Sequence, residues 1–359
     1  MSRQTVVPFG PQHPVLPEPI QLKLTLEDER IVGALPAFGY CHRGVEKAGE
    51  INEYAQNVFL VERICGICSF IHALCYCQGI EQIMGVEVPS RAKYLRVIWS
   101  ELHRIHSHLL WIGLLADAFG FESLFMQTWR YREKVMDVLE KTCGSRVIIS
   151  TCTIGGVRRD ISEENLSEIL STLKEVQGHL DQIAHVIEKD YTVRKRCIGV
   201  GMLPREQALA FGAVGPTMRG SGIAQDLRMT GYAAYGDLNF EPVVETGCDS
   251  YARALVRVRE CYQSIDLVRQ AIDRMPAGDL AVKVRGNPNG EVVFRVEQPR
   301  GELIYYIKGN GTKNLERLRV RTPTYANAAT LLTMLPGMTL ADVPVIALSI
   351  DPCFSCTER

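Results

Sequence analysis

Two pairs of cysteines near opposite ends of the chain constrain its fold more than any other feature. Cys65 and Cys68 form one Cys-x-x-Cys pair, and Cys353 and Cys356 form the other, just before the last residue, Arg359. A turn or helix N-terminus places residues i and i+3 on one side, so that both thiolates can bind the same ion. A four-sulfur site made from both pairs requires a fold that brings the two ends together.

Composition favours metal ligands over disulfides. The chain has 359 residues, 46% of them hydrophobic, and twelve cysteines. No stretch reaches the ~18 uncharged apolar residues of a membrane span, and residues 1–10 lack the basic start and apolar run of a signal peptide. We therefore expect synthesis in the reducing cytoplasm, where cysteines more often bind metals or carry out redox chemistry than form disulfides. The formal net charge of −1, with mixed signs, argues against nucleic-acid binding.

Long helices are expected to dominate the fold. Apolar residues recur at three- and four-residue spacing in residues 95–112, 166–187 and 258–272. Ser162 precedes the second of these segments as a plausible N-cap, and the third begins near Asp249. A fourth helix is predicted over residues 122–143, ending at Gly144. Packed lengthwise, these segments predict a helical bundle.

A smaller antiparallel β region is expected beside the bundle. Alternating leucines predict a β-hairpin over residues 21–35, and the segments 281–285, 292–296 and 303–307 have strand-like composition. The apolar run 343–350 is predicted to be a strand that leads into the last cysteines. No repeat or linker divides the chain. We therefore expect one mainly α, α+β domain over residues 1–359, in which the hairpin and the C-terminal tail both reach the metal site.

Four thiolates leave several metals possible. Sulfur donors select zinc, nickel, iron or an iron–sulfur cluster. A scaffold protein with structural zinc is therefore one alternative. Zinc ribbons, however, are small modules whose ligand pairs lie close together in sequence. Cys68 and Cys353 are separated by 285 positions, which favours a redox-active centre enclosed by a whole domain.

The cysteine motifs resemble those of a known family. The first, Arg63-Ile-Cys-Gly-Ile-Cys followed by His72, and the second, beginning at Asp351-Pro352, are similar to those of nickel–iron hydrogenase large subunits. The segments 10–14 and 42–44 and the compact size resemble the energy-converting, Ech-type membrane-bound group. That group is related to the quinone-site subunit of respiratory complex I, whose members lack the paired thiolates and form the other alternative. The resemblance implies a catalytic subunit that interconverts protons, electrons and dihydrogen.

The resemblance also implies how the metals are bound. Cys65 and Cys353 would be terminal nickel ligands, and Cys68 and Cys356 would bridge nickel to an iron that carries CO and cyanide. His72 follows Cys68 by one helical turn and is expected to donate a hydrogen bond to the thiolate.

Two further charged residues match functional positions of that family. Arg300, in the segment Glu297-Gln-Pro-Arg-Gly, would lie over the metal site, with Asp351 as its carboxylate partner. Glu18, held between Pro17 and Pro19, would be the first proton acceptor beyond the thiolates. The alternatives are a solvated loop charge for Arg300 and an exposed turn acid for Glu18.

Other candidate ligands are weaker. Glu46 matches a position that binds Mg²⁺ together with a terminal histidine, but this chain ends in Arg359, which would instead pair with Glu46. His103, His106 and His108 do not share one helix face and are expected to be core or interface residues. The remaining eight cysteines lack metal spacing and are interpreted as small buried apolar residues.

Partners follow from the chemistry and the resemblance. The chain has no further cysteine set for an iron–sulfur cluster, so electrons require a separate iron–sulfur small subunit. The resemblance implies a ferredoxin-like subunit, ferredoxin as electron carrier, and integral membrane subunits that translocate ions. It places this chain peripherally on the cytoplasmic face of the cell membrane.

Overall fold

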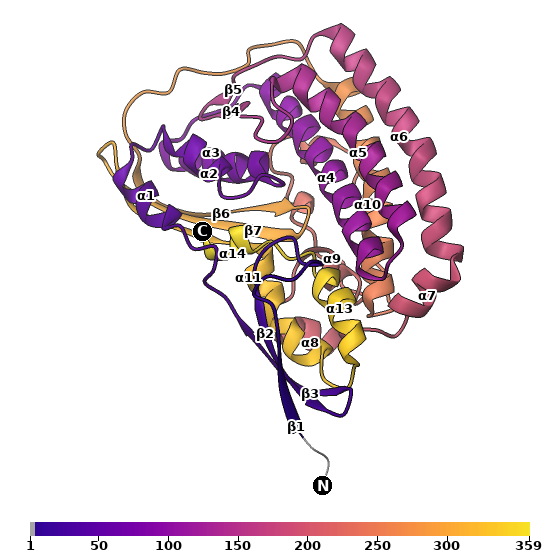
Figure 1. The fold of residues 1–359 in the computed structure, drawn as a ribbon. Coiled ribbons are helices and arrows are strands. Elements are labelled where there is room, and N and C mark those ends of the chain that lie inside the picture. The colour runs from indigo at the N-terminus through magenta and orange to yellow at the C-terminus, as the bar shows by residue number, and fades with distance from the viewer. Residues whose placement is uncertain (1–3) are drawn as a thin grey trace.

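Four long helices lie lengthwise against one another on one side of the molecule (Figure 1). The computed structural model describes residues 4–359, and the four helices are α4 (Ser90–Ala118), α5 (Glu122–Cys143), α6 (Glu163–Lys189) and α10 (Ser250–Arg274). Helix α4 is almost entirely buried, because it packs against α5 and α10 as well as the metal-site segments. The predicted bundle and the mainly α, α+β fold class are confirmed.

The helix ends follow the predicted caps. The Ser162 hydroxyl accepts a hydrogen bond from the backbone N–H of Asn165 at 3.2 Å, and the Asp249 carboxylate accepts one from Ala252 at 2.8 Å. Gly144 ends α5 in the left-handed conformation with φ 80°, which glycine adopts without steric cost. These caps satisfy backbone groups that have no partner within the helix.

Two three-stranded antiparallel sheets lie beside the bundle. The first contains β1 (Gln4–Phe9), β2 (Gln21–Glu27) and β3 (Arg30–Ala37), and it confirms the predicted hairpin. The second contains β6 (Asn289–Gln298), β7 (Gly301–Asn310) and β8 (Leu315–Arg321). Helix α3 (Ser69–Met84) packs on β6 and β7. Strands β1 and β8 were not predicted from the sequence.

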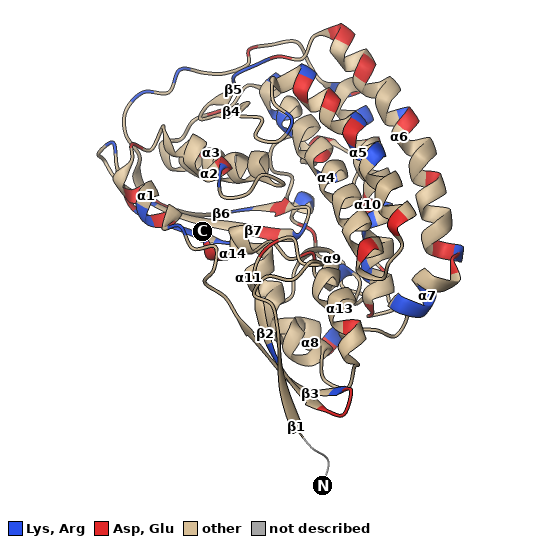
Figure 2. Cartoon of the chain, viewed as in Figure 1, with Lys and Arg blue, Asp and Glu red and all other residues tan. Residues whose placement is uncertain are grey.

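Short elements connect these layers. They are α1 (Val45–Ile51), α2 (Asn57–Glu62), β4 (Cys152–Thr153), β5 (Gly156–Val157), α7 (Tyr191–Cys197), α8 (Arg205–Ala210), α9 (Gly215–Arg219), α11 (Pro323–Asn327), α12 (Leu331–Met334), α13 (Val343–Ser349) and α14 (Phe354–Glu358), with 3-10 turns at Leu227–Thr230, Tyr235–Asp237, Ala328–Thr330 and Leu340–Asp342. Acidic and basic residues are interspersed along the helices (Figure 2). Among residues 4–359, no helix combines the length and apolar character needed to cross a bilayer.

Two predicted strands are wrong. Residues 343–349 form helix α13, with a proline in its first turn. Because α13 is buried on nearly every side, its apolar run has no periodicity that distinguishes helix from strand. The segment 281–285 forms no strand; only Ala281 makes an isolated bridge, to Gly156.

Candidate metal centre

The four predicted cysteines meet at one buried point. Cys65 and Cys68 lie in the turn between α2 and α3, and Cys353 and Cys356 lie at the start of α14 and within it. The Sγ atoms of Cys65 and Cys353 are 3.3 Å apart, and those of Cys68 and Cys356 are 3.4 Å apart. Each side chain is 5% exposed or less. The fold therefore pairs each cysteine of the first motif with one of the second.

These separations suit one shared ion. Two sulfurs bound at about 2.3 Å to the same metal lie about 3.3 to 3.8 Å apart, depending on geometry. Hydrogen bonds from Cys353, Cys356 and Cys68 lower the pKa of the Cys65 thiol well below its ordinary value. Burial raises the pKa of Cys356 well above its ordinary value. A bound cation is therefore required before all four sulfurs can carry charge in this buried place.

Arg43 ties the two cysteine motifs together. Its guanidinium donates to the carbonyl of Arg63 at 3.1 Å, to that of Ile64 at 2.8 Å and to that of Ser355 at 2.9 Å. The first two carbonyls precede Cys65, and the third lies inside the second motif. Arg43 was predicted only as part of a family motif, and its contacts with the two cysteine motifs were not predicted.

His72 is held against a thiolate of the opposite pair. Its Nε2 lies 3.4 Å from Sγ of Cys356, whereas the sequence suggested the thiolate of Cys68. Its Nδ1 lies 2.8 Å from the hydroxyl of Tyr305 on β7. Burial lowers the pKa of His72 to about 4, and burial also keeps Tyr305 a phenol by raising its pKa. A neutral histidine carries one ring N–H, so in the tautomer that donates Nε2–H to the sulfur, Nδ1 accepts from the phenol.

Arg300 lies in the two-residue turn between β6 and β7. Its Nη2 is 2.9 Å from Oδ1 of Asp351, its Nε donates to the Asp351 carbonyl at 3.0 Å, and its Nη1 donates to the Ser107 hydroxyl at 3.3 Å. The side chain is 2% exposed. Burial opposes its charge, but the Asp351 carboxylate raises the pKa of Arg300 above its ordinary value. The structure therefore contains the expected pair and fixes the guanidinium beside Asp351, the first residue of the second motif.

Two buried arginines also fix the end of β6, just before the turn that carries Arg300. Arg104 on α4 donates to the carbonyls of Glu297 at 2.9 Å and Gln298 at 3.0 Å. The Glu297 carboxylate accepts from Arg219 at 2.8 Å. Because these contacts are buried, they leave the turn little freedom to move.

Glu18 reaches the second cysteine motif from the loop before β2. Its Oε1 lies 4.0 Å from Sγ of Cys353, and its Oε2 accepts from the backbone N–H of Ser355 at 2.9 Å. The Ser355 hydroxyl donates to Oε1. Glu18 is half-buried, so its carboxyl connects a buried sulfur with the more exposed side of the loop.

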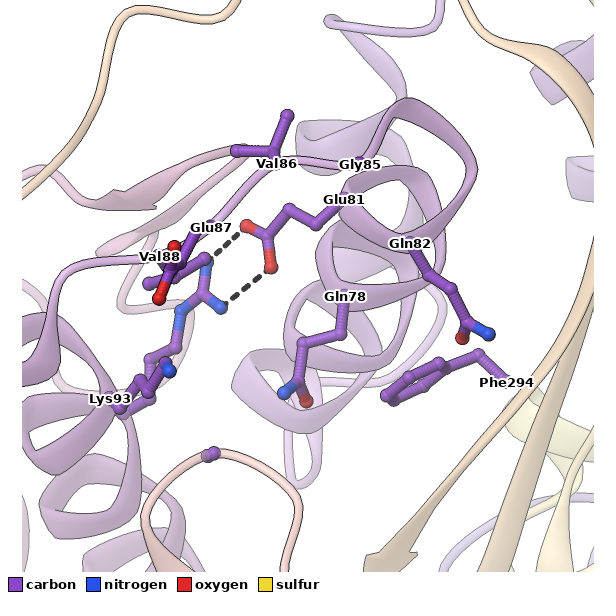
Figure 3. A pocket seen from close by; sticks show the side chains of 11 residues that line it. Gln78, Glu81, Gln82, Gly85, Val86, Glu87, Val88, Lys93 and Phe294 are labelled. Carbon is purple, nitrogen blue, oxygen red and sulfur yellow. Dashed lines mark hydrogen bonds and ion pairs between the residues drawn. The ribbon is translucent and has the colours of Figure 1, made fainter.

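A small cavity of 110 Å³ lies next to Cys353 and Arg300. Its walls combine the polar groups of the site with apolar side chains; the lining residues are Pro17, Glu18, Ile67, Leu110, Trp111, Leu114, Arg300, Leu348, Asp351, Pro352 and Cys353. A larger cavity of 470 Å³ lies at the other end of α3 (Figure 3). There Glu81 and Arg96 pair with each other at 2.6 Å, and none of the predicted site residues lines the cavity. The smaller cavity is therefore the one that belongs to the candidate centre.

Glu46 pairs with Arg359, as inferred from the sequence. Arg359 Nε lies 2.9 Å from Oε1 of Glu46, and Arg319 Nη1 lies 3.1 Å from Oε2. The backbone N–H of Val320 donates to Oε1 as well. A Mg²⁺ ion requires carboxylate, carbonyl or water oxygens. Two guanidinium groups on the Glu46 carboxylate do not fit such an ion.

The remaining histidines of α4 are core residues. His103 and His106 stack edge to face at 5.5 Å, and the Nδ1 of His106 accepts from Arg132 Nε at 2.9 Å. His108 instead contacts Glu260 at 2.8 Å. Six of the eight other cysteines are buried, as expected, whereas Cys41 and Cys248 are half-buried.

Comparison with known proteins identifies the family. The family model of the respiratory-chain NADH dehydrogenase 49-kDa subunit matches residues 118–287 and 282–359, and that of nickel-dependent hydrogenase matches residues 43–117. The chain belongs to the family of large subunits that these two descriptions share. The resemblance to energy-converting membrane-bound hydrogenases drawn from the cysteine motifs is confirmed.

Individual relatives match over nearly the whole chain. The membrane-bound hydrogenase subunit alpha of Pyrococcus furiosus is 43% identical over 98% of this chain and 87% of the relative. The carbon monoxide-induced hydrogenase of Rhodospirillum rubrum is 40% identical over the full length of both. A chain of the solved membrane-bound sulfane sulfur reductase, an archaeal respiratory membrane complex, is 31% identical, with a TM-score of 0.94 over 99% of this chain and 98% of that chain.

Proposed function

We propose that this chain is the catalytic subunit of an energy-converting nickel–iron hydrogenase that interconverts protons, electrons and dihydrogen. The observation that carries the proposal is the meeting of four buried sulfurs from both ends of the chain, at 3.3 and 3.4 Å. The names of the relatives from P. furiosus and R. rubrum support it. The intact thiolate set argues against the quinone-site alternative.

The donor set fits the implied metals. Cys65 and Cys353 would hold nickel as terminal ligands, and Cys68 and Cys356 would be shared with an iron that carries CO and cyanide, as the resemblance implies. The bridging assignment of Cys356 agrees with the hydrogen bond from His72, which would reduce the charge on a shared sulfur. When bound, the centre supplies the place where dihydrogen is split heterolytically.

Side chains of the protein would stabilise negative charge at the centre and transfer protons away from it. Arg300, fixed by Asp351, holds a positive charge over the site in a water-poor environment, where it interacts strongly with developing negative charge. Glu18 accepts a proton from the Cys353 sulfur and carries it to the half-exposed side of the loop, while Ser355 holds its carboxyl in place. The apolar wall formed by Leu110, Trp111 and Leu114 lines the cavity with groups that suit a small apolar gas.

Electrons must leave through other subunits. We propose an iron–sulfur small subunit beside this chain, a ferredoxin-like subunit and ferredoxin as the carrier, and integral membrane subunits that move ions. The relatives' membership of membrane complexes supports membrane partners. The chain would then lie peripherally on the cytoplasmic face of the membrane.

Metal analysis of the anaerobically purified complex tests this function. Nickel and iron in equal amounts, together with hydrogen-dependent reduction of a viologen dye, are the expected result. Zinc alone would establish the structural-scaffold alternative. Reduction of a quinone by a chain that binds no nickel would establish the quinone-site alternative.

We expect Arg300→Lys to slow turnover without loss of metal. Lysine retains the charge but lacks the planar guanidinium that contacts the carboxylate and carbonyl of Asp351 together. A decrease of at least roughly tenfold corresponds to about 1.4 kcal/mol of activation free energy. Arg295→Lys is the matched control, since Arg295 lies on β6, the strand that leads into the turn of Arg300, but is 52% exposed. Turnover as in the wild type, at full metal content, would return Arg300 to the structural role of a buried ion pair.

We expect Arg359→Ala to reduce the yield of metal-filled protein. The pair with Glu46 is 15% and 16% exposed, so its loss detaches the last residue from Glu46, which keeps its pair with Arg319, and loosens α14, which carries Cys356. The ratio of nickel to iron in the protein that is filled should not change. Arg317→Ala serves as the control, because Arg317 is 44% exposed and pairs with Glu50 on the same helix as Glu46. Equal metal yields from both variants would refute a role of Arg359 in holding the tail.

A further inference from the structure

The side chain of Gln298 is buried without a hydrogen-bond partner. It is 0% exposed, and neither Oε1 nor Nε2 pairs with any protein atom among residues 4–359. Its backbone is nevertheless well fixed, since its carbonyl accepts from Arg104 at 3.0 Å. Buried amides are normally hydrogen-bonded, because leaving them unpaired is unfavourable. An amide in this state points to a partner that the polypeptide does not supply.

Strand alternation shows which way Gln298 faces. Its neighbour Glu297 points toward Arg219 and Leu227, on the side of β6 away from α3. Successive side chains of a strand point to opposite faces. Gln298 therefore shares the face of Phe294, whose Cβ would meet a methyl group placed on Gly79 of α3. This is the face that packs against α3.

The register along α3 places Gln298 near the sulfurs. Phe294 lies beside Cys75 and Gly79, with its carbonyl 3.6 Å from the Cys75 sulfur. The four residues from Phe294 to Gln298 extend about 13 Å along the strand. The same distance spans about nine residues of helix. Moving from Cys75–Gly79 toward the N-terminus of α3 by that amount reaches residues 66–70, which include Cys68.

The cross-strand neighbours agree with this direction. Tyr305 is the β7 partner of Phe294, and its hydroxyl reaches His72, one turn into α3. Gln298 lies one step before the β6–β7 turn and two residues from Arg300, which contacts Asp351 beside the second cysteine motif. The amide thus lies between the first motif and the turn.

We infer that Gln298 positions the iron side of the metal centre by donating an Nε2–H hydrogen bond to one of its cyanide ligands. The inference rests on the proposed function. The four sulfurs are not its partner, because the amide makes no hydrogen bond to any of them. A cyanide on the implied iron would offer an anionic nitrogen acceptor that could satisfy this N–H donor. Gln298 is therefore a positioning residue, and no proton is transferred to it.

Infrared spectroscopy of the intact complex carrying Gln298→Met tests the inference. Methionine has a similar length and volume but no N–H donor. We expect nickel and iron at the wild-type ratio, with one cyanide stretching band shifted more than the other cyanide band and the CO band. Exchange into D₂O should move the same cyanide band in the wild type and leave it in place in the variant.

Gln78→Met is the matched control. Gln78 also has a buried, unpartnered amide oxygen on α3, but it lies ten residues after Cys68, or about 15 Å along the helix, beside the larger cavity (Figure 3). The infrared bands of the Gln78→Met variant should coincide with those of the wild type. Unchanged bands in Gln298→Met, and no effect of D₂O on the wild type, would show that Gln298 binds only water and would overturn the inference. Absence of all three bands from the wild type would instead refute the proposed function.

Discussion

Cys65→Ser and Cys353→Ser are each expected to remove most of the nickel and to reduce hydrogen turnover by at least roughly a hundredfold. That loss corresponds to about 2.7 kcal/mol of activation free energy. Serine replaces a soft, polarisable sulfur with a hard oxygen, which is a poor ligand for nickel in a thiolate site. The two sulfurs are 3.3 Å apart, so the loss of either one leaves its partner buried beside an incomplete coordination sphere.

Metal content by mass spectrometry and hydrogen-dependent dye reduction together measure this effect. Cys261→Ser is the control, since Cys261 is equally buried but lies on α10. It should lower stability at most, and the nickel content should stay at the wild-type level. A Cys353→Ser protein with full nickel and ordinary turnover would show that the second motif does not bind the catalytic metal.

Glu18→Gln is expected to retain both metals but to turn over at least roughly a hundredfold more slowly, again about 2.7 kcal/mol. Glutamine has the size of glutamate and can still accept from Ser355, so the loop should keep its conformation. It cannot accept and release a proton. Because the Cys353 sulfur is buried, a proton left there needs a carrier, and Oε1 of Glu18 at 4.0 Å is in position to take it.

Proton–deuterium exchange separates this role from a structural one. We expect the variant to bind hydrogen, detected as a change in its metal spectrum, while exchange with solvent becomes slow. Glu27→Gln is the control. Glu27 is the last residue of β2, the strand that follows Glu18, and this variant should exchange protons as the wild type does. Rapid exchange in the Glu18 variant would mean that protons leave by another route.

Sequence periodicity predicted the elements that have one buried and one exposed face. The seam of α6 from Leu166 to Ile187 is the only buried part of that helix, and its spacing was therefore visible. In α13, Val343, Val345, Ile346 and Leu348 are all buried, so no periodic contrast was available. The failure at residues 343–350 follows from burial on all sides.

The metal ligands were predictable because short spacings place them within single turns. The groups that orient them were not, because each comes from a distant segment. Tyr305 reaches His72 across 233 positions, and Arg43 reaches Ser355 across 312. Ser355 occupies an unspecified position between the two cysteines of the second motif, so the motif does not predict its contact with Arg43. Such contacts depend on tertiary packing, which local pattern does not encode.

Because the paired cysteines are 288 positions apart, a metal bound by them would also cross-link the two ends of the chain. In the chain-entropy description of cross-links, closing even a 100-residue loop is worth about 4.7 kcal/mol, and longer loops add slowly to that value. The metal would therefore restrict the unfolded ensemble of almost the entire polypeptide. Unfolding of the metal-bound protein should begin in the outer helices. Proteases should cleave the cross-linked C-terminal tail only after the metal has been removed.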